Sequence, residues 1–242
     1  ERRIERLTPD PKPSTDPVQG RAPTRLGVFG GTFDPPHLGH RSVAADVADH
    51  LNLTEVVWIP AGDPPHKRRR NLTPADLRLR MVQAATADDP RFRVSEIEIH
   101  RDGPSYTVDT LRALKDEHDG WELYLILGID QYRTFHRWRK PEEIVGLATL
   151  AVMDREGEAL ALGVAEASGT LVAPRPSPTS GTPGTVGNVL SVPVGRVDIS
   201  STQVRAAVSR GESIVALVPA EVAEIIEAEG LYRRDGERGR HR

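Results

Sequence analysis

The sequence contains no cysteine in 242 residues. Disulfides and thiolate metal sites are therefore excluded, and the composition fits a reducing compartment. Basic and acidic residues nearly balance, at 32 and 35 with a formal net charge of -3, so no strongly basic surface for nucleic acid is predicted. No apolar run approaches the roughly 18 residues of a membrane span, and the first residues lack the apolar stretch of a signal peptide. We therefore expect a cytoplasmic protein without nucleic-acid or membrane partners.

Large apolar residues are also scarce in residues 1–24, which are charged and rich in proline. Such a segment cannot bury enough surface to offset its ordering entropy, so we predict a disordered arm. Residues 173–188 are rich in Pro, Gly, Ser and Thr and are predicted to form a flexible loop, and residues 234–242 a basic tail. The remaining residues 25–233 are long enough for a single domain with a sizeable core.

Apolar runs and helical patterns alternate through this domain. The runs typical of buried strands cover residues 25–30, 55–60, 92–100, 121–128, 149–155 and 189–194. The helical patterns cover residues 37–51, 73–87, 105–118, 141–148, 201–211 and 219–232. Thr73 is expected to be the N-cap of its helix, with Pro74 at the first helical position. The alternation predicts an α/β fold: a doubly wound, Rossmann-like parallel sheet of five to six strands with a small C-terminal helical part.

The first predicted strand leads into Gly-Gly-Thr-Phe-Asp-Pro-Pro-His-Leu-Gly-His, residues 30–40. In an open parallel sheet, ligands bind outside the carboxyl ends of the strands, and Gly30 and Gly31 allow the backbone to approach a ligand closely. His37 and His40 are three residues apart, so they share one face at a helix N-terminus, where free N–H groups and the helix dipole favour anions. The stretch therefore predicts a polyphosphate site.

Other interpretations of this stretch are less specific. The spacing Gly-Val-Phe-Gly-Gly-Thr does not match the G-x-G-x-x-G fingerprint of a dinucleotide-binding dehydrogenase. A zinc site would require a third ligand at a suitable spacing, which the sequence does not offer. A glycine turn with two incidental histidines would require no ligand at all.

A second candidate anion site is Ile-Ser-Ser-Thr-Gln-Val-Arg, residues 199–205. Ser200, Ser201 and Thr202 offer hydroxyl and backbone N–H groups where a strand turns into a helix. Arg205 follows one turn later and can reach the same anion with a planar, permanently charged fork. The alternative is that Ser200 only caps the helix and that Arg205 is an exposed helix residue.

Three intermediate segments carry further chemistry. Ser105, Tyr106 and Thr107 stand where a loop enters a helix, and Lys67 follows a Pro-Pro-His sequence after another strand. Gly128 and Asp130 end an apolar strand, which suits close approach to a sugar and a carboxylate for its hydroxyls. Trp138 lies eight residues after Asp130 in the sequence.

These motifs together resemble the HxGH nucleotidylyltransferases. Residues 37–40 match HxGH, and residues 199–205 are similar to the second family motif, ISSTxxR. Within that superfamily, the Ser-Tyr-Thr segment, Leu-Gly-Ile-Asp and Trp138 resemble the bacterial nicotinate mononucleotide adenylyltransferases. The resemblance implies transfer of AMP from ATP to nicotinate mononucleotide, giving nicotinate adenine dinucleotide and pyrophosphate, in NAD biosynthesis.

The resemblance also implies residue roles. The catalytic residues it implies are His37, His40 and Arg205. The residues it implies for ATP binding are Gly30, Gly31, Thr32, Phe33, His37, His40, Gly128, Asp130, Ile199, Ser200, Ser201, Thr202 and Arg205. Those implied for the acceptor are Lys67, Ser105, Tyr106, Thr107 and Trp138. Mg²⁺ is expected on the ATP phosphates, with no metal site or nucleophile on the protein.

Several alternatives stay open at the level of sequence. A sibling enzyme would use another phosphate acceptor, such as nicotinamide mononucleotide or phosphopantetheine, or a cytidylyl donor. A non-catalytic nucleotide sensor would share the same fold. Arg139 stands where the family frequently has Tyr or His, and backbone N–H groups near Tyr106 and Thr107 are the expected readers of the nicotinate carboxylate. A homo-oligomer is neither indicated nor excluded.

Overall fold

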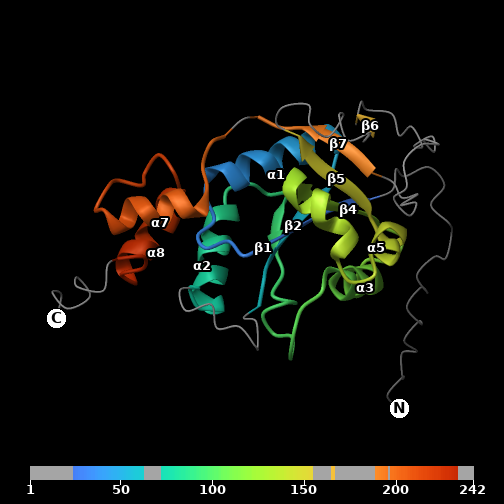
Figure 1. The fold of residues 1–242 in the computed structure, drawn as a ribbon, viewed down its shortest axis with the longest axis horizontal. Helices are drawn as coiled ribbons and strands as arrows, with labels where there is room; N and C mark the ends of the chain where they lie inside the picture. The colour runs from blue at the N-terminus through green and yellow to red at the C-terminus, as the bar shows by residue number, and fades with distance from the viewer. Residues whose placement is uncertain (1–23, 63–71, 155–164, 167–188, 196, 234–242) are drawn as a thin grey trace, which may run out of the picture.

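The computed structural model describes residues 24–62, 72–154, 165–166, 189–195 and 197–233, and these form one parallel sheet flanked by helices (Figure 1). The strand order is β3-β2-β1-β4-β5-β7-β6, and every neighbouring pair is parallel. The strands are β1 (Arg25–Gly31), β2 (Glu55–Pro60), β3 (Phe92–Val94), β4 (Glu122–Gly128), β5 (Thr149–Asp154), β6 (Ala165–Glu166) and β7 (Val189–Pro193). The predicted doubly wound sheet is confirmed, with the two-residue β6 added at one edge.

The helices follow the strands along the chain. They are α1 (Leu38–Leu51), α2 (Ala75–Thr86), α3 (Thr107–Glu117), α4 (Ile129–Thr134), α5 (Pro141–Leu147), α7 (Ser201–Ser209) and α8 (Ala220–Ala228), with a 3-10 turn η1 (Phe135–Arg137) after α4. Among the described residues, no helix is long and apolar enough to cross a membrane.

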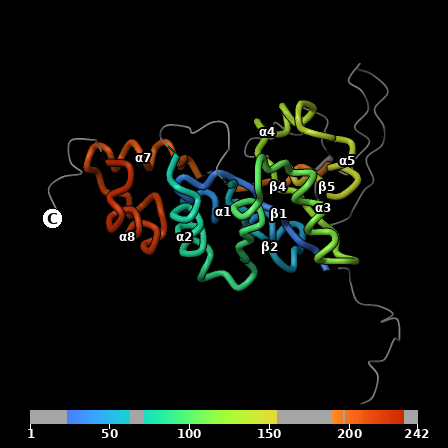
Figure 2. The backbone as a smooth tube through the Cα atoms, turned by 90° about the horizontal axis from the view of Figure 1, so that it is seen from below, coloured from blue at the N-terminus to red at the C-terminus, as the bar shows by residue number. Residues whose placement is uncertain are grey.

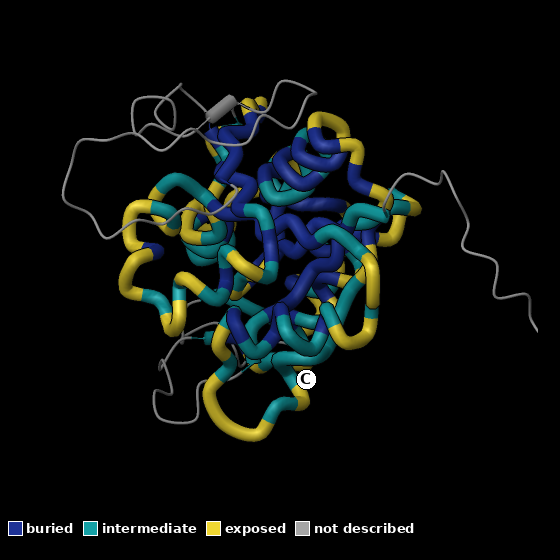
Figure 3. Tube along the Cα trace, turned by 90° about the vertical axis from the view of Figure 1, so that its right-hand side faces the viewer, coloured by how far each residue is buried: buried dark blue, intermediate teal, exposed yellow. Residues whose placement is uncertain are grey.

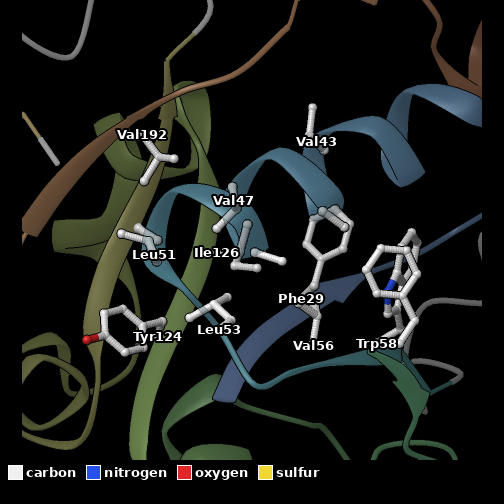
Figure 4. Packing of buried hydrophobic residues seen from close by; sticks show 14 of the residues in the cluster. Phe29, Val43, Val47, Leu51, Leu53, Val56, Trp58, Tyr124, Ile126 and Val192 are labelled. Carbon is white, nitrogen blue, oxygen red and sulfur yellow. The ribbon is translucent and has the colours of Figure 1, made fainter. Parts of the chain in front are cut away.

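Both faces of the sheet are covered, which explains the nearly continuous apolar strands. Successive side chains of a strand point to opposite faces. Phe29 of β1 and Ile126 of β4 therefore pack with Val43 and Val47 of α1 on one face (Figure 4). Residues one position away, such as Val28, join α3 and α5 on the other face. The buried residues accordingly fill the interior, while the exposed ones lie mainly on the surrounding loops and outer helix faces (Figure 3).

The C-terminal helices form the predicted small helical part. Together, α7 and α8 pack on the side of α2 that faces away from the sheet, at the opposite end of the molecule from α3 and α5 (Figure 2). The buried side chains of this contact are Met81, Ala85, Val204, Ala207, Ile214, Val218, Val222 and Ile226. This third apolar cluster holds α7 near the carboxyl end of β1, where α1 begins.

Two local predictions were wrong. The strand predicted over residues 92–100 stops at Val94, because its neighbour β2 ends at Pro60, which has no N–H to donate to a longer ladder. Thr73 is not the N-cap of α2: Pro74 holds that position, and the Thr73 hydroxyl donates to the Tyr232 hydroxyl instead, over 3.2 Å. The sequence patterns also gave no indication of α4.

Several predictions concern residues outside the described ones. These are most of the predicted arm (residues 1–23), the predicted loop (residues 173–188) and the predicted tail (residues 234–242). Thr24 is described, and its carbonyl accepts a 2.9 Å hydrogen bond from the backbone N–H of Glu122. The single-domain boundaries stay a prediction.

Candidate active site

The strand order reverses between β1 and β4. From β1 the chain proceeds through α1 to β2 on one side, whereas β4 leads to β5 on the other side. Crevices of open α/β sheets form at the carboxyl ends of the two strands that flank such a reversal. Gly31 ends β1 and Gly128 ends β4, so the two sequence motifs that follow these strands meet at this crevice.

The two histidines cap α1 reciprocally. His37 is the N-cap, and its Nδ1 accepts the backbone N–H of His40 over 3.3 Å; the Nδ1 of His40 accepts the N–H of His37 over 3.2 Å. Their ring centroids lie 3.7 Å apart at an interplanar angle of 30°. Because each Nδ1 accepts, each neutral ring carries its proton on Nε2. The pair therefore forms two N–H donors of fixed orientation at a helix N-terminus, which suits a phosphate chain.

Each glycine near this histidine pair stands at its position for a different structural reason. A Cβ on Gly39 would lie 3.0 Å from Nδ1 of His37 and 3.4 Å from the carbonyl oxygen of Ile199, so any larger residue would require the His37 ring to shift. A Cβ on Gly31 would come within 3.0 Å of the Phe33 ring, which itself lies edge-on to His40 at 5.1 Å. Gly30 is exposed and has no atom near its Cβ direction, so it leaves open space at the end of β1.

The second motif packs directly on the first. The hydroxyl of Ser201 donates to the carbonyl of Pro35 over 2.8 Å, although the two residues are 166 positions apart. Nη1 of Arg205 donates to the carbonyl of Asp34 over 2.7 Å, and Nη2 donates to the Thr202 hydroxyl over 3.2 Å. The N-termini of α1 and α7 thus lie beside each other, as the shared-anion interpretation requires.

Both alternatives for the second motif can now be compared with the geometry. Ser200 does cap α7, since its hydroxyl accepts the N–H of Gln203 over 3.2 Å. Arg205, in contrast, is partly buried and bound to the loop before α1, so it is not a free surface residue.

A buried polar network behind the loop was missed by the sequence patterns. The carboxylate of Asp34 accepts from the Tyr232 hydroxyl over 2.7 Å and from the N–H of Thr73 over 3.5 Å. Arg78, with none of its surface exposed, donates to the carbonyls of Thr32 and Thr73, each over 2.9 Å. Burial, together with the adjacent Asp34 carboxylate, raises the pKa of Tyr232, which therefore stays a hydrogen-bond donor.

The β4 side of the crevice holds the residues predicted for the sugar. Gly128 is the N-cap of α4, and its N–H donates to the side-chain carbonyl of Gln131 over 2.9 Å. The side chain of Asp130 is 91% exposed, with Arg133 at 3.3 Å. The carboxylate of Asp130 is therefore accessible to the hydroxyls of a ligand.

The predicted acceptor residues lie on the α3 and α5 side of the sheet. Tyr106 is the N-cap of α3, and Thr107 is its first residue. Trp138 packs against Phe135 with ring centroids 5.4 Å apart. The hydroxyl of Ser105 donates weakly, over 3.5 Å, to the carbonyl of Glu98. Lys67 lies outside the described residues.

Comparison with known proteins identifies the family. The sequence pattern described as "Cytidylyltransferase-like" matches residues 28–207, which include both motifs of the crevice. The chain belongs to the cytidylyltransferase-like family.

Curated relatives carry a more specific name than the family does. The chain is 37% identical over 208 residues to the "Probable nicotinate-nucleotide adenylyltransferase" of Geobacillus thermodenitrificans, covering 86% of each chain. It is 41% identical over 209 residues to the protein of the same name from a Roseiflexus species, covering 86% of this chain and 98% of that one. The predicted resemblance to the nicotinate mononucleotide adenylyltransferases is thereby confirmed.

Solved structures share the fold. The nicotinic acid mononucleotide adenylyltransferase of Plasmodium falciparum, complexed with NaAD, superposes with a TM-score of 0.64 at 17% identity. The match covers 86% of this chain and 97% of that chain. The same enzyme complexed with APC gives a TM-score of 0.63 at 16% identity, over 86% and 97% of the two chains. At these identities the likeness concerns the fold.

Proposed function

We propose that this cytidylyltransferase-like protein transfers AMP from ATP to nicotinate mononucleotide, forming nicotinate adenine dinucleotide and pyrophosphate. The observation that carries the proposal is the packing of the second motif on the first, through Ser201 and Arg205, beside the paired histidines. Two helix N-termini, two imidazole donors and a guanidinium would together bind one triphosphate. The names of the curated relatives support nicotinate mononucleotide as the acceptor.

The reaction requires no protein nucleophile. A phosphate oxygen of the acceptor attacks the α-phosphorus of ATP, the bond between this phosphorus and the bridging oxygen breaks, and pyrophosphate leaves with the electron pair. The attacking group is already an anion, so no general base is needed. Catalysis then depends on holding the reactants in line and on stabilising the charge that develops on the phosphates.

Each part of the site has a distinct task in this scheme. The Nε2–H groups of His37 and His40 would bind the triphosphate, with His40 nearer the α-phosphate. Arg205 has five N–H donors, and its two protein bonds leave others for the departing β- and γ-phosphates. Gly128 and Asp130 would lie against the ribose.

A nucleotidyltransferase that uses ATP calls for a divalent cation in general. We propose Mg²⁺, which would enter on the oxygens of ATP as part of the substrate. The donor set fits this arrangement, because the imidazole nitrogens of His37 and His40 suit phosphate oxygens better than a hard cation that prefers oxygen ligands. Cytoplasmic location and the absence of nucleic-acid and membrane partners stay predictions.

Pyrophosphate release tests the proposal. The purified chain should release pyrophosphate only when ATP and nicotinate mononucleotide are both present. His40→Ala should lower kcat/KM by about 10² or more, since a single preorganised electrostatic donor contributes roughly that factor. His50→Ala is the matched control, because His50 is an exposed residue at the other end of α1 and bonds only the carbonyl of Asp46.

The remaining candidates predict different results. A sibling enzyme would release pyrophosphate with another acceptor, such as nicotinamide mononucleotide or phosphopantetheine, but not with nicotinate mononucleotide. A nucleotide sensor would bind ATP without turnover in any mixture. Near-wild-type turnover by His40→Ala would overturn the role given to that histidine.

A further inference from the structure

A cation–π contact joins the two segments predicted to hold the acceptor. The guanidinium carbon of Arg139 lies 4.5 Å from the centroid of the Tyr106 ring. Tyr106 is the N-cap of α3, whereas Arg139 follows Trp138 directly after η1. The side chain of Arg139 therefore bridges the gap between the start of α3 and the segment after β4.

The charge of Arg139 is not neutralised by a neighbouring acid in the described part of the chain. Nearby cations have carboxylate partners: Lys140 pairs with Glu143 at 3.1 Å, and Arg133 with Asp130 at 3.3 Å. Arg139 is exposed, and no carboxylate of the described residues forms an ion pair with it. Its positive charge is thus available to a ligand.

Stacking leaves the useful edge of this side chain open. A guanidinium over an aromatic ring uses its flat face, while its N–H donors lie in its plane and point outward. These donors match the two oxygens of a carboxylate, and the stack limits the freedom that the long side chain would otherwise lose on binding. The arrangement is a preorganised fork for a planar anion.

We propose that Arg139 is a specificity-determining residue, which binds the carboxylate of the pyridine ring and favours the acid mononucleotide over the amide. This inference rests on the proposed function. The guanidinium lies over the aromatic ring of Tyr106, and the acceptor anion attached to an aromatic ring is the carboxylate. The acceptor's phosphate must instead reach the histidines for attack. An amide is neutral and offers one acceptor oxygen, so its NH2 group would face the second N–H donor of the fork and leave that donor unpaired.

The test compares both mononucleotides with the full-length chain at saturating ATP. Arg139→Gln should lower kcat/KM for nicotinate mononucleotide by about 10-fold to 100-fold, the effect of losing a charge-assisted hydrogen bond. The value for nicotinamide mononucleotide and the KM for ATP should change by less than about threefold. Arg139→Lys keeps the charge and loses the fork, so an intermediate value is expected. Arg137→Gln, an exposed arginine two residues away that contacts His136, is the matched control.

The outcomes separate this inference from the proposed function. If the ratio of kcat/KM for the acid mononucleotide to that for the amide is unchanged in an active Arg139→Gln enzyme, the role of Arg139 alone is overturned. This includes the case in which both values fall equally, because the guanidinium would then contact a group that the two mononucleotides share. A wild-type chain that does not adenylylate the acid mononucleotide would overturn the proposed function, and this role with it.

Discussion

On the β1 side of the crevice, His37 is 5% exposed and is held in the reciprocal cap of α1, and Asp34 is 6% exposed and accepts from the distant Tyr232 hydroxyl. On the β4 side, the side chain of Asp130 is 91% exposed, and Tyr106 contacts the exposed Arg139. In the proposed reaction, the β1 side would stabilise the charge that develops on the phosphates, and its donors are already in place. The β4 side would recognise the acceptor through side chains that are open to solvent. Burial and hydrogen bonding are thus concentrated on the side proposed to act on the phosphates.

The largest expected effect comes from a substitution beside His37, on the β1 side of the crevice. Gly39→Ala should lower kcat by about 10-fold to 100-fold, because the new Cβ would lie 3.0 Å from Nδ1 of His37 and force its ring to shift, and small misplacements of a positioned group are costly. Gly146→Ala is the control, since a Cβ there meets nothing within 4 Å on α5. It should leave kcat unchanged and raise the free energy of unfolding by roughly 0.5–1 kcal/mol. Steady-state kinetics and urea unfolding measure both; equal kcat values for the two variants would contradict the role of Gly39.

A second substitution removes a hydrogen bond to the β1 side from a residue far along the chain. Tyr232→Phe deletes the hydroxyl that donates to Asp34, so the free energy of unfolding should fall by about 1–3 kcal/mol, with a smaller loss of kcat. Tyr132→Phe alters α4 on the other side, where the described residues offer that hydroxyl no hydrogen-bond partner, and should change stability by less than about 0.5 kcal/mol. Urea unfolding of the two variants measures the difference. Similar losses of unfolding free energy in the two variants would mean that the Tyr232 hydroxyl stabilises the β1 side no more than the Tyr132 hydroxyl stabilises the β4 side.

A third substitution tests the β4 side of the crevice. Trp138→Ala should raise the KM for nicotinate mononucleotide roughly 10-fold, as expected for a lost aromatic stack, while the KM for ATP changes little. Trp138 is only partly buried, so the fold should tolerate the substitution. Initial rates with each substrate varied in turn provide the measurement. Parallel increases in both KM values would show that Trp138 acts through packing.

The smallest effect concerns the loop that precedes Tyr106. Burial raises the pKa of Glu98 above its ordinary value of 4.5, although the Thr110 hydroxyl and Arg101 oppose the shift. The folded protein therefore holds this proton more tightly than the unfolded chain. Its contribution to stability is fully present below pH 4.5 and is lost as the pH rises through the folded-state pKa. Glu98→Gln should flatten this part of the stability curve, measured by urea unfolding at increasing pH from 4.5 upward.

A matched control exists for the last prediction. Glu224→Gln on the exposed face of α8 removes a carboxylate that forms no ion pair among the described residues. Its stability curve should follow that of the wild type. If Glu98→Gln gives the same curve as this control, the buried carboxyl does not contribute to the pH dependence.

The sequence predicted the sheet and the two phosphate motifs because both are local patterns. Buried parallel strands are apolar throughout, and HxGH is a helix N-terminus within four residues. The contacts of Asp34 with Thr73 and Tyr232 could not be predicted, because they join residues 39 and 198 positions apart. Thr73 was assigned to a helix cap for the same reason: its actual partner is far along the chain. The end of β3 depended on Pro60 of its neighbour, which no pattern in residues 92–100 reveals.

The hydroxyl bond from Tyr232 to Asp34 has a consequence for how the protein is made. Asp34 leaves the ribosome early, and its partner is synthesised 198 residues later. Strands β1 to β5 can pair while synthesis continues, but the loop before His37 gains its last hydrogen bond only after α8 has emerged. Contacts of such long sequence separation form late, since closing a long loop costs more entropy. A nascent chain therefore acquires its fold before it acquires its complete site, and nucleotide turnover should reach its full rate only after Tyr232 has emerged.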